Sequence, residues 1–150
     1  MKEKNIFAVP TFTIMEYFAQ HPEHPDDAKK YRQELAYHAA QFKKQLAAGV
    51  PFALGTDVVP FPHGTQAREF ELMVQYGMPA ADVLRADLLH GAIIMHMADS
   101  IGQLKPGYLA DIIAVPGNPL TDIGVVRHVQ FVMKDGEIVR RKPIAPPTIH

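Results

Sequence analysis

The sequence of 150 residues contains no cysteine, which excludes disulfide bonds, thiolate metal ligands and a cysteine nucleophile. It has no apolar run near the roughly 20 residues that a membrane-spanning helix needs, and its start, MKEKNIFAVP, lacks the apolar core of a signal peptide. The 15 basic and 16 acidic side chains leave a formal net charge of -1, so neither nucleic acid nor a membrane is expected as a partner. We expect a cytoplasmic protein.

The composition that remains is that of one ordinary domain. With 47% hydrophobic and 21% charged residues, the chain can bury a core. Residues 6–12 and 52–56 are short apolar runs that predict strands, and the near-continuous apolarity of the second is typical of a strand buried on both faces. Apolar residues at three- and four-residue steps, or multiples of them, predict a helix over residues 26–48. Further helices are expected over residues 65–76 and from Pro79 onward.

The pattern changes after residue 100. The stretches GQLKPGYLADIIAVPGNPL and VVRHVQFVMKDGEIVRR are short β-branched runs separated by Gly and Pro, and the Asp-Gly pair within KDGE predicts a hairpin turn. We therefore expect an α/β part over residues 1–100 and a small β part over residues 101–150. Strand, helix, strand, helix, helix is too little to close a (β/α)8 barrel of about 250 residues, but enough to be the end of one.

The apolar run FALGT is followed directly by a carboxylate, Asp57, and then by a loop rich in Pro and Gly. In a parallel α/β barrel the catalytic groups lie at the C-terminal ends of the strands. A carboxylate at that position can ligate a divalent metal or accept a proton from metal-bound water. The alternative is that Asp57 caps the next turn, because Asp is common where a strand passes into a loop. Local sequence alone favours the cap.

Four stretches of the chain resemble the C-terminal part of the metal-dependent amidohydrolase superfamily, in particular its imidazolonepropionase-like and prolidase-like branch. They are AVPTF, AAGVPFALGTDVVPFPHG, QYGMPAADVLRAD and IGQLKPGYLADIIAVPGNPLTDI. Their order and spacing form a specific signal that spans most of residues 6–124. The resemblance implies an α/β fold: the last two strands and helices of a (β/α)8 TIM-type barrel over residues 1–100, and part of a small β-sandwich domain over residues 101–150.

The same resemblance assigns chemistry to the GTD motif. In the family, the aspartate that matches Asp57 ends the last barrel strand, ligates the metal and moves protons for the attacking water. The other metal ligands come from earlier strands, beginning with an HxH pair, and this sequence contains no HxH. One carboxylate cannot hold a catalytic zinc, which takes three protein ligands. Zn²⁺, or another divalent metal, is therefore expected only in a complete protein, and the isolated chain is expected to be inactive.

The histidines are a second set of candidates. By resemblance, His63 in PHG matches an HG pair of the prolidase-like branch and would contact the substrate at the mouth of the active site. The alternative is a loop histidine that caps the following helix. His90 and His96 are six residues apart, about 240° around a helix, so they do not face one metal.

Two hypotheses of different class remain. In the first, the chain is the C-terminal part of a metal-dependent hydrolase that cleaves C–N bonds in a small amide, cyclic amide or dipeptide-like substrate. In the second, it is a non-catalytic remnant or assembly subunit that lacks the full metal site. Two barrel strands alone leave open sheet edges, so we expect a homo-oligomer or association with the missing N-terminal segment.

Overall fold

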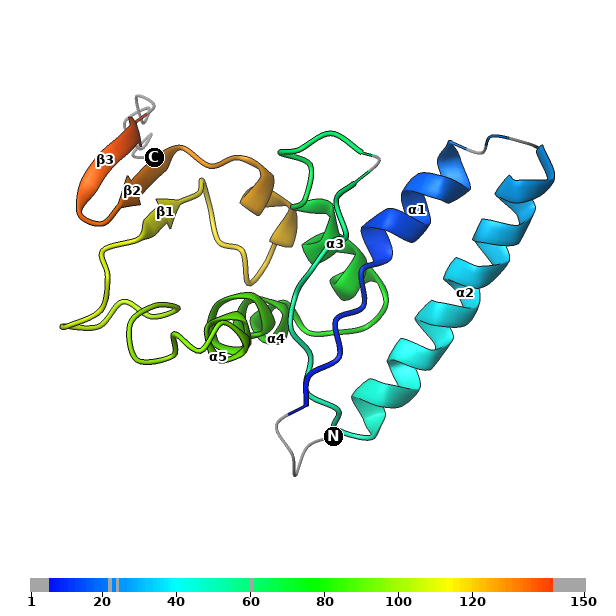
Figure 1. Ribbon diagram of the computed structural model, residues 1–150, viewed down its shortest axis with the longest axis horizontal. Helices are drawn as coiled ribbons and strands as arrows, with labels where there is room; N and C mark the ends of the chain where they lie inside the picture. The colour runs from blue at the N-terminus through cyan, green and yellow to red at the C-terminus, as the bar shows by residue number, and fades with distance from the viewer. Residues whose placement is uncertain (1–5, 22, 24, 60, 142–150) are drawn as a thin grey trace, which may run out of the picture.

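The computed structural model describes residues 6–21, 23, 25–59 and 61–141 (Figure 1). Its helices are α1 Phe12–Gln20, α2 Pro25–Ala47, α3 Arg68–Gln75, α4 Ala80–Arg85, the π-helix η2 Ala86–His90, α5 Gly91–Ile94 and the 3-10 helix η3 Ile123–Arg127. Its strands are β1 Ile112–Ala114, β2 Phe131–Lys134 and β3 Glu137–Arg141. In this part of the chain, no helix combines the length and apolarity that crossing a membrane requires.

The two apolar runs that were expected as strands lie side by side and parallel, but the pairing is a single bridge. Ala8 pairs with Phe52; the Ala8 amide donates to the Pro51 carbonyl at 3.0 Å, and the Ala53 amide donates to the Ala8 carbonyl at 2.9 Å. Pro10 has no N–H to continue the ladder. The expected strands over residues 6–12 and 52–56 are therefore wrong in extent, although their parallel direction is observed.

The helices agree with the sequence pattern to different degrees. Helix α2 lies within one residue of the expected bounds, and Gly49 ends it at φ 69° while the Val50 amide donates to the Gln45 carbonyl at 3.0 Å. The second helix, α3, begins at Arg68, later than expected, because residues 62–65 form a turn in which the Thr65 hydroxyl donates to the Pro62 carbonyl. The third is divided into α4, η2 and α5. Helix α1 was not predicted.

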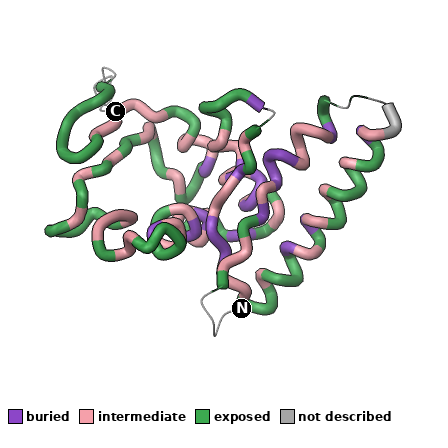
Figure 2. The backbone as a smooth tube through the Cα atoms, viewed as in Figure 1, coloured by how far each residue is buried: buried purple, intermediate pink, exposed green. Residues whose placement is uncertain are grey.

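The core lies where α1, α2 and α3 meet the two extended segments, and buried residues concentrate there (Figure 2). Phe12 at the start of α1 is fully buried, and its ring centroid is 5.1 Å from that of Phe42 on α2. Phe42 in turn is 4.6 Å from Phe52 on the second extended segment. Edge-to-face aromatic contacts of this kind add to the stabilisation that burial of the rings supplies. They hold the two extended segments against α2.

The three short strands form an antiparallel sheet of order β1-β2-β3 at one end of the molecule (Figure 1). Asp135 and Gly136 both have positive φ, 51° and 81°, which is the turn that an Asp-Gly hairpin adopts. The hairpin prediction is confirmed. The strand expected upstream is wrong at VVRHV: the Asp122 carboxylate accepts a hydrogen bond from the Gly124 amide at 2.9 Å and starts η3 instead.

Candidate functional site

The parallel pairing brings the ends of two chain segments to one edge of the molecule. Thr11 ends the first segment at φ 48°, and Asp57 ends the second at φ 53°; both are left-handed backbone conformations that side chains other than glycine rarely adopt. Gly55 allows the close approach, since an added Cβ there would lie 2.6 Å from a Cγ of Val9. The three residues of GTD thus differ in their surroundings. Gly55 allows the close contact with Val9, Thr56 is buried at 8% exposure, and Asp57 lies where the chain turns with a positive φ.

Asp57 presents its carboxylate to solvent at this edge. Its carbonyl accepts a hydrogen bond from the Val59 amide at 2.9 Å, which closes the turn through the backbone. No hydrogen bond to the Asp57 carboxylate is found among the residues that the structure describes. Local sequence favoured Asp57 as a cap of the next turn. In the described structure its side chain forms no such cap.

His63 lies on the exposed loop between Asp57 and α3. Its Nδ1 is 3.5 Å from the amide nitrogen of Gln66, at the limit of a hydrogen bond. Ala67 is the residue that precedes α3, and no side-chain hydrogen bond caps that helix. His63 therefore does not cap α3. No hydrogen bond or ion pair joins His63 and Asp57 in the part of the chain described.

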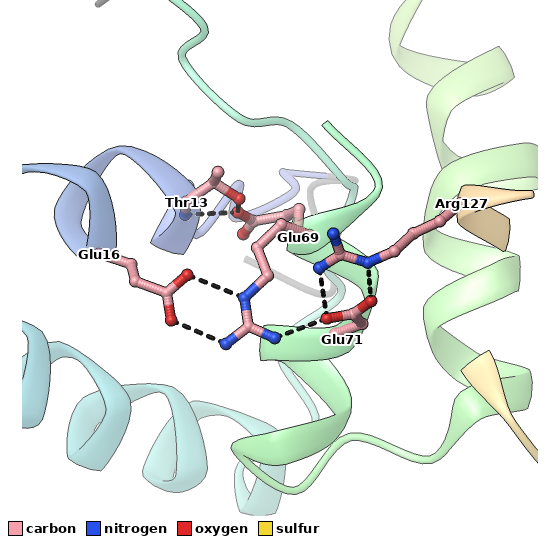
Figure 3. Close-up of polar contacts among 6 residues, drawn as sticks. Thr13, Glu16, Glu69, Glu71 and Arg127 are labelled. Carbon is pink, nitrogen blue, oxygen red and sulfur yellow. Dashed lines mark hydrogen bonds and ion pairs between the residues drawn. The ribbon is translucent and has the colours of Figure 1, made fainter. Parts of the chain in front are cut away.

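A buried carboxylate fixes the start of α1 below this edge. Glu69, in the first turn of α3, is 0% exposed and accepts a hydrogen bond from the Phe12 amide at 2.8 Å. It also accepts hydrogen bonds from the Thr13 amide at 2.8 Å and the Thr13 hydroxyl at 2.6 Å (Figure 3). Burial raises the pKa of Glu69, while the bonds from Thr13 and Phe12 oppose that rise by stabilising the ionised form. Glu69 thus satisfies amides at the N-terminus of α1, which its preceding residue Thr11 does not cap.

A network of two carboxylates and two guanidinium groups lies beside Glu69 and links α1, α3 and η3 (Figure 3). Arg68 donates from Nε and Nη2 to both oxygens of Glu16 on α1 at 2.8 and 2.7 Å, and from Nη1 to Glu71 at 2.6 Å. Arg127 on η3 donates from Nε and Nη2 to both oxygens of Glu71, so Oε2 of Glu71 accepts from both arginines. The hydrogen bond to Glu16 is the largest cause of the raised pKa of Arg68, and the bond from Arg127 is the largest cause of the lowered pKa of Glu71.

A hollow of about 260 Å³ opens between α1 and the loop that follows Asp57. It is lined by Tyr17 and His21, whose rings stack at 4.4 Å, and by Phe61, whose ring lies 5.8 Å from that of Tyr17. Thr13, Glu16 and Arg68 of the polar clusters also border it. The hollow combines aromatic surface with charged groups at the edge that carries the GTD loop.

The described residues do not make a metal site by themselves. No group of three or more His, Asp or Glu side chains with the geometry to hold a metal occurs among them. Asp57 fits a ligand role only with further ligands from outside these residues, because a catalytic zinc takes three protein ligands. His90 also lies near the extended segments, but its ring is hydrogen-bonded to the backbone. Its Nδ1 lies 2.5 Å from the Phe52 carbonyl oxygen.

Sequence reasoning missed the polar clusters around α3. The (i, i+3) spacing of Arg68 and Glu71 is a local signal for their ion pair. Glu16 lies 52 residues from Arg68 and Arg127 lies 56 residues from Glu71, so no spacing rule connects them. Burial of Glu69 has no sequence signal at all, because Glu is rarely fully buried.

The sequence matches the amidohydrolase family over residues 1–139. The chain belongs to the amidohydrolase family. It is 33% identical to ochratoxinase from Aspergillus niger over 97% of this chain and 32% of that protein. It is 29% identical to imidazolonepropionase from Geobacillus kaustophilus over 70% of this chain and 26% of that protein. The resemblance to this superfamily and branch is thus confirmed.

The three-dimensional comparison agrees. A crystal structure of a Xaa-Pro dipeptidase with methionine in its active site superposes with a TM-score of 0.83 at 33% identity, over 93% of this amidohydrolase chain and 36% of that one. The crystal structure of A. niger ochratoxinase gives 0.81 at 32% identity, over 97% and 34%. The mixed α/β fold with its small sheet is therefore that of the family. The chain spans about a third of the length of these relatives.

Proposed function

We propose that this chain forms the C-terminal part of a hydrolase that cleaves C–N bonds in a small amide, cyclic amide or dipeptide-like substrate, with Asp57 as its proton-transfer group. One observation carries the proposal. Two parallel segments end at one edge, where Asp57 of the GTD motif is exposed with a positive φ, and the loop that follows it borders a hollow lined by aromatic and charged side chains. Ochratoxinase and the Xaa-Pro dipeptidase are the relatives that support an amide or dipeptide substrate.

The proposed role of Asp57 is to take a proton from the attacking water and pass it to the leaving nitrogen. An exposed carboxylate without a hydrogen-bond donor in the described chain has both oxygens available for this transfer. The proposal includes Asp57 as one ligand of a divalent metal, with Zn²⁺ as the first candidate, whose other ligands the remaining two-thirds of a family polypeptide would supply. It also includes His63 as a substrate contact, a (β/α)8 barrel completed by that polypeptide, and a cytoplasmic location.

The test compares two aspartates that both have a positive φ. In a protein completed by the missing two-thirds, in cis or as a separate chain, Asp57→Asn is expected to lower kcat on N-acyl amino acids or dipeptides by at least about 100-fold. Asp135, at φ 51° in the β2–β3 turn, is the control: Asp135→Asn removes the same charge at a similar φ. Both variants are expected to fold, because Asn tolerates positive φ. Near-normal turnover by the Asp57 variant would contradict the proposal.

The alternative, a non-catalytic remnant or assembly subunit, is favoured by the lack of a three-ligand group in the described residues. The two are distinguished by zinc titration calorimetry before and after the missing segment is added. Tight zinc binding and activity that appear together on addition support the enzyme. A complex or homo-oligomer that forms without either supports the subunit. Tight stoichiometric zinc binding by the isolated chain, lost in Asp57→Ala, would show that this chain holds a complete metal site, and would refute the claim that the other ligands come from outside it.

A further inference from the structure

A second hollow, of about 570 Å³, lies between the loop before α3 and the small sheet. Its lining includes Gly64, which is next to His63 in the loop, the stretch of residues 126–130 at the end of η3, and Arg140 on β3. Its volume is within the range of about 300–1,000 Å³ that is typical of small-molecule sites. We refer to it as the Arg140 hollow.

The side chains of the Arg140 hollow that can carry a charge are all basic ones. They are Arg127, His128 and Arg140, and the amide of Gln130 joins them; within the part of the chain described, no Asp or Glu side chain lines the hollow. A cavity with one sign of charge concentrates small ions of the opposite sign. Arginine suits this role because its planar fork of N–H groups matches a carboxylate or phosphate.

The two arginines contribute differently. Arg127 is held in place by Glu71, which accepts hydrogen bonds from its Nε and Nη2 and offsets its charge (Figure 3). The remaining N–H groups of Arg127 are available as donors in a fixed orientation. Arg140 forms no ion pair with any residue that the structure describes. Arg140 therefore supplies the net positive charge and Arg127 an oriented donor.

The hollow also has an apolar wall. Val126 and Val129 line it, on the same stretch of chain as the basic groups. An inorganic ion would leave this wall exposed, whereas an organic anion would cover it, and burial of apolar surface adds about 25 cal/mol per Å² to binding. The lining is mainly polar with a smaller apolar part, which suits a ligand that joins a charged end to a small apolar body.

We propose that the Arg140 hollow binds a small organic oxyanion, a carboxylate or a phosphate ester carried on an apolar body, through Arg140 and the free N–H groups of Arg127. This site is separate from the Asp57 edge, and the proposal does not depend on the proposed hydrolase function. Gly64 connects the two in the chain, since the same loop carries His63.

The sheet offers a matched control for the test. In the β2–β3 register Arg140 pairs with Val132 and Arg141 pairs with Phe131, and successive side chains of a strand point to opposite faces. Arg140 lines the hollow and Arg141 does not. Arg140→Gln and Arg141→Gln therefore remove the same charge from adjacent exposed positions, and circular dichroism checks that both variants fold.

The experiment is calorimetric titration of the 150-residue chain with benzoate, phenyl phosphate and inorganic phosphate at one ionic strength. Saturable binding of at least one aromatic anion is expected, tighter than that of inorganic phosphate. Arg140→Gln is expected to weaken it by about tenfold or more, and Arg141→Gln by less than about twofold, because Arg140 lines the hollow and Arg141 does not. Preference between benzoate and phenyl phosphate identifies the acidic group.

Three results would overturn the proposal. They are no saturable binding at millimolar concentration, equal weakening by the two variants, and inorganic phosphate binding as tightly as the aromatic anions. Amide chemical-shift changes in the unsubstituted chain give a second measurement that does not rely on a variant. They are expected to concentrate at Gly64, Gln130 and Arg140, and shifts spread evenly over the surface would count against the site.

Discussion

Replacement of Glu69 by alanine tests the buried hydrogen bonds by which Glu69 on α3 holds the start of α1, which we call the Glu69 clamp. The side chain is 0% exposed and accepts three hydrogen bonds, two of them from the backbone amides of Phe12 and Thr13. Its removal leaves those amides without an acceptor, and a buried unpaired donor costs about 1–3 kcal/mol. The two amides together with the cavity therefore set an expected loss of about 3–5 kcal/mol in the free energy of unfolding.

A loss of this size is a large part of the total. A domain of this length is stable by about 5–15 kcal/mol, and about 1 kcal/mol shifts the midpoint temperature by about 2–4 °C at this size. Glu69→Ala is therefore expected to lower Tm by about 6–20 °C. Glu69→Gln keeps the shape and one acceptor oxygen but turns an amide donor toward N–H groups, so an intermediate loss is expected.

The assay is urea unfolding at neutral pH, with Glu34→Ala as the control. Glu34 lies on α2 with its side chain 45% exposed and forms an ion pair with Lys30 at 4.0 Å, so its removal is expected to cost less than about 0.5 kcal/mol. If Glu69→Ala were as stable as Glu34→Ala, the clamp would not hold α1 and the reasoning would be wrong. An intact circular dichroism spectrum with a lowered urea midpoint is the expected outcome.

Two further predictions follow from close contacts. Gly55→Ala is expected to destabilise the chain by about 1–3 kcal/mol, because its Cβ would lie 2.6 Å from Val9, and Val9→Ala in the same chain is expected to restore most of the loss in urea unfolding. Arg127 lowers the pKa of Glu71, so the stability that Glu71 contributes is present above its ordinary carboxyl value of 4.5 and is lost as pH falls through the lower folded value. The gap in urea midpoint between the unsubstituted chain and Glu71→Gln should therefore be full above pH 4.5 and shrink as the pH falls below it, and a gap independent of pH would refute the ion pair.

Local chemistry made several elements readable from the sequence. The periodic apolar stripe and Gly49 placed α2 within one residue at each end, and Asp135 with Gly136 placed the β2–β3 turn, because both signals act within a few residues of the chain. The order of the motifs identified the family and singled out Asp57. The same motifs predicted that Asp57 follows a segment paired in parallel with an earlier one. The Ala8–Phe52 bridge confirms the parallel direction.

Tertiary contacts decided what those signals could not. The apolar runs form one bridge in place of two strands, since pairing depends on neighbouring strands that no local pattern supplies. Helix α1 starts at Phe12 because Glu69, 57 residues away, accepts its first amide, and Arg68 reaches Glu16 across 52 residues. The hollow at Arg140 likewise exists only because the loop before α3 meets the small sheet. Contacts at such separations leave no periodic trace, so composition and spacing determine the elements, and only the packed structure determines how their charges meet.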